Sequence, residues 1–123
     1  MNPRDLRPRR ALVIGKNAVE LMDIEDFLRA RGWFAPIITE DVDNAARLLA
    51  DTVEAFHLVI VAAPHANPQA VALIRSCVDE ACPVLVINGA SATAQPGQVV
   101  LMTRPFSDAD LDEALTALGL PEI

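Results

Sequence analysis

The first residues that could do chemistry are two cations and a helix start. In the stretch VIGKNAVEL, residues 13–21, an apolar run ends in Gly15 and Lys16, and a helical pattern begins at Asn17. Arg104 follows a later apolar run. Backbone N–H groups point outward at the first turn of a helix and attract anions, and nearby cations add to that attraction. Lys16, Asn17 and Arg104 are therefore candidate binding residues for a small anion or for the phosphates of a nucleotide.

Two features limit this interpretation. A phosphate-binding P-loop has an additional upstream glycine and a Ser or Thr after its lysine. This chain lacks that glycine and carries Asn17 after Lys16. The plainer alternative, in which Lys16 points into solvent and Arg104 only fills space, therefore stays open.

Other catalytic or metal-binding side chains are sparse. His57 and His65 have no evident carboxylate or nucleophile beside them, which acid–base catalysis requires. Cys77 and Cys82 supply two thiols, whereas a zinc site takes about four ligands, so we interpret them as small buried apolar side chains. Acidic clusters fall on helix starts and solvated helix faces, and only residues 40–43 lie near the expected site. We expect no enzyme activity, no metal site and no cofactor.

Composition restricts the class of protein. The 123 residues suit one domain with a single core, and with 52% hydrophobic but only 4% aromatic residues that core is aliphatic. No apolar run approaches the roughly 20 residues of a membrane span, and the N-terminus lacks the apolar segment of a secretory signal. A net charge of −7 does not suit a nucleic-acid backbone. We expect a cytoplasmic protein without membrane or nucleic-acid partners, with residues 1–10 as a flexible Arg-rich tail.

Apolar runs alternate with helical patterns along the chain. The runs predict strands at residues 11–14, 33–39, 56–62, 83–87 and 99–102. The patterns between and after them predict helices from Asn17 to Gly32, from Asp41 or Asp43 to about Val53, from Asn67 through Cys77, and from Ser107 to Gly119. Pro36 has no backbone donor and favours an edge position for the second strand. The expected fold is α/β: a flavodoxin-like, doubly wound, five-stranded parallel sheet in the order 2-1-3-4-5.

Short motifs within this pattern are similar to those of a known family. Arg104-Pro105-Phe106 resembles a Lys-Pro-Phe motif, and residues 83–89, PVLVING, resemble a Pro-Val-Ile strand ending in Thr or Ser and then Ala. Gly32 matches a glycine after the first helix. With these motifs the chain from Ala11 to Leu118 resembles a response-regulator receiver domain, and we take residues 11–123 as the receiver-like domain.

The same resemblance implies that the reacting residues are missing. The acidic pair that binds Mg²⁺ in the family falls on Gly15 and Lys16, and the phosphoacceptor aspartate falls on Ala62. The phosphoryl-sensing hydroxyl falls on Asn88, and the lysine falls on Arg104, which alone keeps its charge. An alanine supplies no nucleophile for an aspartyl phosphate. The resemblance therefore implies a degenerate pseudo-receiver.

The segment after the fourth strand also departs from the family. Receiver domains join the fourth and fifth strands through a full helix, whereas residues 88–104 lack a helical pattern. We predict that the fourth helix is shortened or missing, which leaves the fifth strand as a poorly covered edge. Apolar edge strands tend to be paired or covered. We therefore predict a self-association surface at Val99, Val100, Leu101 and Met102.

These observations lead to two functional expectations. The first is a phosphorylation-independent, receiver-like signalling module that acts by protein–protein contact in a two-component-type regulatory system. Its partner would be a kinase, a regulator or a second copy, and we expect a homodimer. The alternative is a sensor of a small anion or a nucleotide phosphate in the crevice at Lys16 and Arg104.

Overall fold

The computed structural model describes residues 9–52, 56–62, 68–87, 98–103 and 106–120. Within them the strands are β1 (Arg10–Gly15), β2 (Phe34–Thr39), β3 (Leu58–Ala62), β4 (Val84–Ile87) and β5 (Val99–Met102). The helices are α1 (Ala18–Ala30), α2 (Val42–Thr52), α3 (Pro68–Asp79) and α4 (Asp108–Ala117). No helix in these ranges is long and apolar enough to cross a bilayer.

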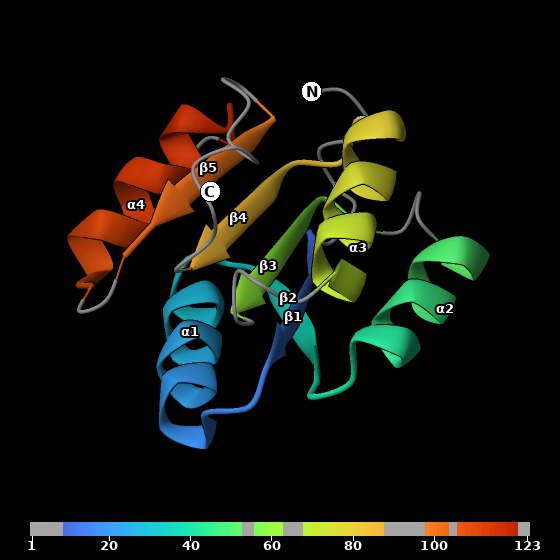
Figure 1. The fold of residues 1–123 in the computed structure, drawn as a ribbon. Coiled ribbons are helices and arrows are strands. Elements are labelled where there is room, and N and C mark those ends of the chain that lie inside the picture. Colours follow the sequence, from blue (N-terminus) through green and yellow to red (C-terminus); the bar gives the residue numbers. More distant parts are fainter. Residues whose placement is uncertain (1–8, 53–55, 63–67, 88–97, 104–105, 121–123) are drawn as a thin grey trace.

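The strands form one parallel sheet in the order β2-β1-β3-β4-β5, as predicted. Helices α1 and α4 cover one face, and α2 and α3 cover the other (Figure 1). Strand β2, which contains Pro36, lies at one edge of the sheet, in agreement with the position that its missing donor favours. Strand β5 lies at the other edge. Residues 88–97 between β4 and β5, where we predict that the fourth helix is shortened or missing, lie outside the described residues.

The core has two layers because successive side chains of a strand point to opposite faces. In β1, Ala11 and Val13 pack toward α1 and α4, while Leu12 and Ile14 pack toward α2 and α3. Every residue of β3 and β4 is buried. Burial on both faces explains why these strands are continuous apolar runs without polar alternation.

The strand boundaries differ from the predicted ones by one or two residues. Trp33, Phe56 and Pro83 precede their strands, where Trp33 and Phe56 are buried. Pro83 has no N–H, but its carbonyl accepts a hydrogen bond from the Val59 N–H at 3.0 Å. Strand β1 begins at Arg10, whose guanidinium lies 5.2 Å from the centre of the Phe34 ring in β2. Residues 1–8 of the predicted tail lie outside the described residues.

The helix starts follow local capping chemistry. Asn17 caps α1 by accepting a hydrogen bond from the Glu20 N–H at 3.1 Å. At the start of α4, Ser107 and Asp110 form a capping box, in which each side chain accepts a hydrogen bond from the other residue's N–H. Both capping positions agree with the sequence prediction. Asn17 lies two residues after the end of β1, and Ser107 lies five residues after the end of β5.

A side-chain pair joins α4 to the residue that follows α1. The Arg31 guanidinium donates two hydrogen bonds to the Asp112 carboxylate, from Nε at 2.9 Å and from Nη2 at 2.6 Å. The same guanidinium lies 4.4 Å from the centre of the Phe27 ring. These hydrogen bonds, together with the positive charge, hold the pKa of Asp112 below its usual value. The pair therefore stabilises the α1–α4 side of the fold most at pH values where Asp112 is ionised in both the folded and the unfolded chain.

Replacement of Asp112 by Asn should lower thermal stability in a pH-dependent way. The pKa of Asp112 is lower in the folded state than in the unfolded state, where it is about 4, so the ion pair stabilises the protein at pH values above about 4. This contribution is lost as the pH falls through the pKa of the folded state. The Tm of D112N should therefore lie below that of the parent at neutral pH and approach it at about pH 2. Thermal melts across this range measure the effect, with E113Q as the matched control because Glu113 is exposed and has no ion pair among the described residues. A Tm difference that is independent of pH would contradict the assignment.

Candidate functional site

The carboxyl ends of β1 and β3 meet at the centre of the expected site. Gly15 and Ala62 are partners in the parallel register of these two strands, and both are buried. A Cβ atom built on Gly15 would lie 3.2 Å from the Ala62 Cβ and 3.1 Å from the Leu21 Cδ2. Both distances are tighter than ordinary carbon–carbon contacts. The place where the resemblance puts the first carboxylate of an acidic pair is therefore closely packed with apolar atoms.

The loop between β1 and α1 carries the predicted anion-binding residues. Lys16 and Asn17 are both exposed. The Asn17 side-chain oxygen is used by the α1 cap. Among the described residues, no carboxylate lies within ion-pair distance of the Lys16 ammonium group. The other predicted site residues, Asn88 and Arg104, lie outside the described residues, so the structure brings together Gly15, Lys16, Asn17 and Ala62 only.

The acidic segment after β2 forms a helix start. The Thr39 hydroxyl oxygen accepts hydrogen bonds from the Asp41 N–H and from the Asn44 side-chain amide, both at 3.2 Å. The Asp41 carboxylate accepts the Asp43 N–H at 2.9 Å, so Asp41 is the residue that opens α2. Across the described parts of the chain, no group of three or more His, Cys, Asp or Glu side chains could hold a metal ion. The acidic segment thus serves as a capping structure.

The two histidines are weaker candidates. His57 lies at the amino end of β3, where its Nδ1 accepts a hydrogen bond from the Arg10 N–H at 3.2 Å. This position is at the opposite end of the sheet from Gly15 and Ala62, as the sequence predicts. His65 lies outside the described residues. His57 is therefore placed to join two strands and not to act at the carboxyl ends.

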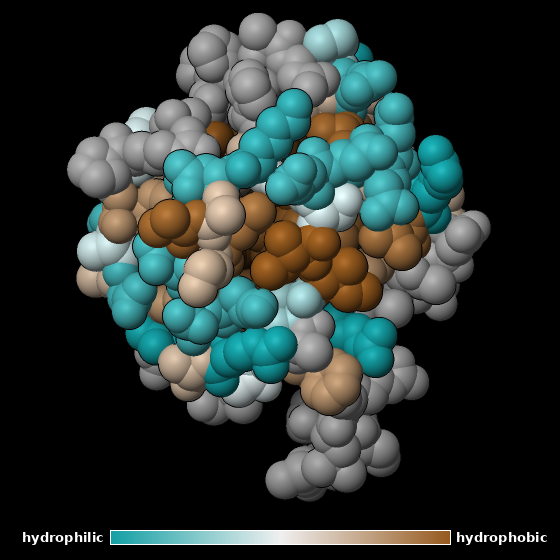
Figure 2. Space-filling model, turned by 90° about the horizontal axis from the view of Figure 1, so that it is seen from below, coloured by the Kyte–Doolittle hydropathy of each residue, from teal (hydrophilic) through white to brown (hydrophobic). Residues whose placement is uncertain are grey.

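Exposed apolar residues on α1 were missed by the sequence analysis. Val19 is 70% exposed and Met22 is 64% exposed, and both lie in the first turns of the helix that follows Lys16. Figure 2 views the molecule from the carboxyl ends of the strands and shows hydrophobic surface among hydrophilic side chains on this face. A signal was available, because both residues lie outside the buried stripe of Leu21, Ile24 and Leu28. An apolar residue off the buried stripe of a helix is a candidate for a contact surface.

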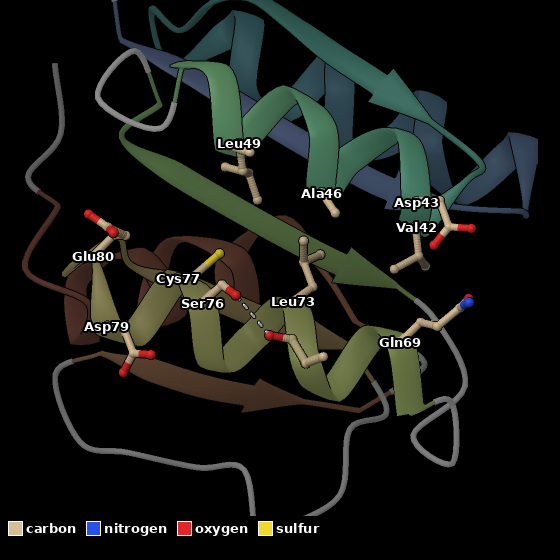
Figure 3. A pocket seen from close by; sticks show the side chains of 12 residues that line it. Val42, Asp43, Ala46, Leu49, Gln69, Leu73, Ser76, Cys77, Asp79 and Glu80 are labelled. Atoms are coloured by element: carbon tan, nitrogen blue, oxygen red, sulfur yellow. Dashed lines mark hydrogen bonds between the residues drawn. The ribbon is translucent and has the colours of Figure 1, made fainter.

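A groove between α2 and α3 was also missed. It has a volume of about 470 Å³ and is lined by both helices. Its apolar wall includes Leu49, Leu73 and Cys77, while Asp43 and Glu80 lie toward its ends (Figure 3). No motif indicates such a groove, because it depends on how two helices far apart in the sequence pack side by side.

The predicted self-association strand is partly covered. Val99 and Met102 are buried, and Val100 and Leu101 are half-buried. Val100 and Met102 belong to the layer that α4 covers, and Val99 and Leu101 belong to the opposite layer. In the described residues β5 pairs with β4 alone, so its outer side is an edge of the sheet.

The strand order and the helices on both faces define a flavodoxin-like, doubly wound fold. No family model and no curated protein matches the sequence. Among solved structures, the chain is similar to the signal receiver domain of an HD domain-containing protein from Pseudomonas fluorescens Pf-5, with 22% identity and a TM-score of 0.69 over 92% of this chain and 96% of that one. It is also similar to a CheY-like response regulator receiver domain from Methylobacillus flagellatus, with 12% identity and a TM-score of 0.66 over 91% and 99% of the two chains.

A third similar structure includes a metal ion. It is the receiver domain of a sensor histidine kinase from Pseudomonas aeruginosa, with magnesium coordinated in its active-site cleft. The identity is 16% and the TM-score 0.66, over 92% of this chain and 99% of that one. These likenesses establish that the chain has the fold of receiver domains, as predicted.

The residues at the carboxyl ends of β1 and β3 do not fit magnesium. This ion requires oxygen ligands at about 2.1 Å in octahedral geometry. Gly15 and Ala62 have no side-chain oxygen, and Lys16 would place a positive charge beside the ion. The apolar contacts around Gly15 also leave no room for a carboxylate without movement of Leu21 or Ala62.

Proposed function

We propose that this protein is a phosphorylation-independent, receiver-like signalling module that acts by protein–protein contact in a two-component-type regulatory system. The single observation that carries the proposal is the packing of Ala62 and the Leu21 side chain around Gly15, which leaves little room for a side chain there, at the carboxyl ends of β1 and β3. The fold of receiver domains supports the signalling role by analogy. As part of the same proposal, the protein acts in the cytoplasm, where it has no enzyme activity of its own.

The chemistry at this point argues against phosphoryl transfer. Transfer to a carboxylate requires a positioned nucleophile and positive charge or metal that stabilises the phosphoryl oxygens. Ala62 supplies no nucleophile, and the position beside it in the register is Gly15. Lys16 supplies positive charge, but no nucleophile stands at Ala62 for that charge to assist. Regulation in this module therefore comes from which surfaces it presents and not from a change of covalent state at Ala62.

Two surfaces support a contact function. The first is the pair Val19 and Met22 on α1, whose side chains are among the most exposed large apolar ones in the described residues. The second is β5, whose outer side is a sheet edge. Edge strands expose backbone donors and acceptors that pair readily with another chain. We propose that a second copy pairs at β5, which gives a homodimer, and that α1 is available to a kinase or regulator.

Incubation with acetyl phosphate and Mg²⁺ tests the phosphorylation-independent part. The intact mass should stay unchanged, because Gly15 and Ala62 supply no carboxylate at the ends of β1 and β3 and the described residues contain no group that could hold a metal ion. The variant A62D serves as the matched comparison, since it restores one carboxylate without the acidic pair, and its mass should also stay unchanged on the same time scale. A parent protein that gains one phosphoryl group, labile in acid and in base, would overturn the proposal.

The anion sensor remains as a second candidate function. Its supporting observation is that Lys16 is exposed beside the start of α1 without an ion pair among the described residues. It is less well supported than the contact function, because the Asn17 side chain is used by the helix cap and Arg104 lies outside the described residues.

A further inference from the structure

Small side chains keep the groove between α2 and α3 open. On α2 the groove is lined by Ala46 and Ala50, and on α3 by Ala72 and Ser76. The two residues of each pair are four positions apart, so they lie on the same face of their helix. All four are exposed. Because the distance between packed helices depends on the side chains at their contact, small residues here allow the backbone of another molecule to approach closely.

The bottom of the groove is apolar. Leu49, Leu73 and Cys77 are buried, and their side chains point from the two helices into the space between them (Figure 3). The volume of the groove is about 470 Å³. Apolar side chains of a bound molecule would therefore meet apolar atoms at the bottom of the groove, where leaving water is favourable.

Acidic side chains lie at both ends of the groove. Asp43 lies at the end where the two helices begin, and Asp79 and Glu80 lie at the other end (Figure 3). All three are exposed, and none forms an ion pair in the part of the chain that the structure describes. The residues that line the groove include no Lys, Arg or His. The charge of the groove therefore favours a molecule that carries positive charge near each end.

The shape of the groove favours a helix. Helices α2 and α3 begin at the same end and run side by side (Figure 3). Helix α3 has 12 residues, which corresponds to a length of about 18 Å. A third helix along this length satisfies its own backbone hydrogen bonds, whereas an extended chain needs backbone partners that α2 and α3 do not offer. Amphipathic helices that lay their apolar face into a groove are a common form of recognition.

A second copy of this chain does not have the matching chemistry. The exposed apolar residues Val19 and Met22 of α1 lie beside the exposed Asp23 and Asp26. Carboxylates of one copy would then face carboxylates of the other, and like charges oppose association. The net charge of −7 acts in the same direction. The groove therefore suits a partner with a different composition.

We propose that the groove between α2 and α3 binds a basic amphipathic helix of a partner protein. The apolar face of this helix packs on Leu49 and Leu73. Its Lys or Arg side chains pair with Asp43 at one end and with Glu80 at the other. The groove lies on the opposite face of the sheet from α1 and away from the edge of β5. The proposal is thus independent of the two contact surfaces and of the phosphorylation-independent role proposed above.

Fluorescence anisotropy with a synthetic helical peptide tests the proposal. The peptide has about 14 residues, with leucines on one face and lysines at both ends, and carries a fluorescein label. It should bind the full chain saturably in the micromolar range, and more weakly at high salt, because the groove carboxylates are exposed. A peptide of the same composition in shuffled order should bind at least about tenfold more weakly, since it has no apolar face. Equal binding of both peptides, or no saturable binding of the first up to about 1 mM, would overturn the proposal.

Variants of the protein locate the contact. Ala72→Phe fills the opening of the groove, and Glu80→Lys reverses the charge at one end; each should weaken binding about tenfold or more. Asp23→Lys is the matched control, because it makes the same charge change at an exposed position of α1 and should bind as the parent does. A positive charge after the last turn of α3 is favourable for that helix, so E80K should fold.

The pattern of affinities decides between occupants. Binding that is unchanged in both A72F and E80K, or weakened equally by D23K and E80K, would overturn the proposal. Deletion of residues 1–8, which include arginines, should leave the affinity for the peptide unchanged. An affinity about tenfold higher after this deletion would overturn the assignment to a partner protein, because the chain's own first residues would then compete for the groove. Circular dichroism checks that each variant is folded, and E80K decides alone if A72F does not fold.

Discussion

Replacement of Gly15 by Asp is expected to destabilise the protein by about 2 to 4 kcal/mol. The new Cβ would meet the Leu21 Cδ2 at 3.1 Å and the Ala62 Cβ at 3.2 Å, so neighbouring side chains must move. The carboxylate would also be placed at a buried position, which adds the cost of removing a charge from water. Urea unfolding measures the change as a lower midpoint at unchanged slope.

The adjacent Lys16 provides the matched control. Lys16 is exposed, and K16D should change stability by no more than about 0.5 kcal/mol, as surface substitutions usually do. The contrast between the two positions separates packing at the strand end from charge in the loop. A G15D protein as stable as the parent would mean that the strand end accommodates a carboxylate, and the argument against a metal site would then fail.

Replacement of Leu101 by Lys is expected to abolish self-association. Leu101 is half-buried in the edge strand β5, and a lysine there would place a charge in the middle of the proposed contact between two copies. A buried, unpaired charge typically costs several kcal/mol at an interface, which lowers an association constant by orders of magnitude. Sedimentation velocity across a range of concentrations measures the change directly.

Thr103 offers a control for the added charge. It is exposed and directly follows β5, so T103K changes the net charge by the same amount as L101K without entering the strand. We expect T103K to associate as the parent does. If the sedimentation of L101K matches that of the parent, β5 is not the contact, provided that circular dichroism shows both variants folded.

The fold could be predicted because each strand has a distinct physical signature. The continuous apolar runs at β1, β3 and β4 reflect burial on both faces, and the missing donor of Pro36 favours the edge position that β2 occupies. Helix starts were predictable for the same reason, since a cap such as Ser107 acts within three residues. Local chemistry therefore accounts for most of the element order and for the edge position of β2.

The candidate site was predictable only in part. The positions of Gly15 and Ala62 followed from the resemblance, but the close approach of the Leu21 side chain to Gly15 depends on how α1 packs on the sheet. The groove beside Cys77 arises from two helices that are distant in the sequence. The turn between α3 and β4 contains a left-handed residue at Ala81, and alanine gives no signal for that conformation.

We propose that contact between copies does not depend on phosphorylation. The most direct measurement is sedimentation velocity of the parent protein at several concentrations, once with EDTA and once with acetyl phosphate and Mg²⁺. We expect the same concentration-dependent association under both conditions. Association that appears only with the phosphodonor and Mg²⁺, or a monomer under both conditions, would contradict it.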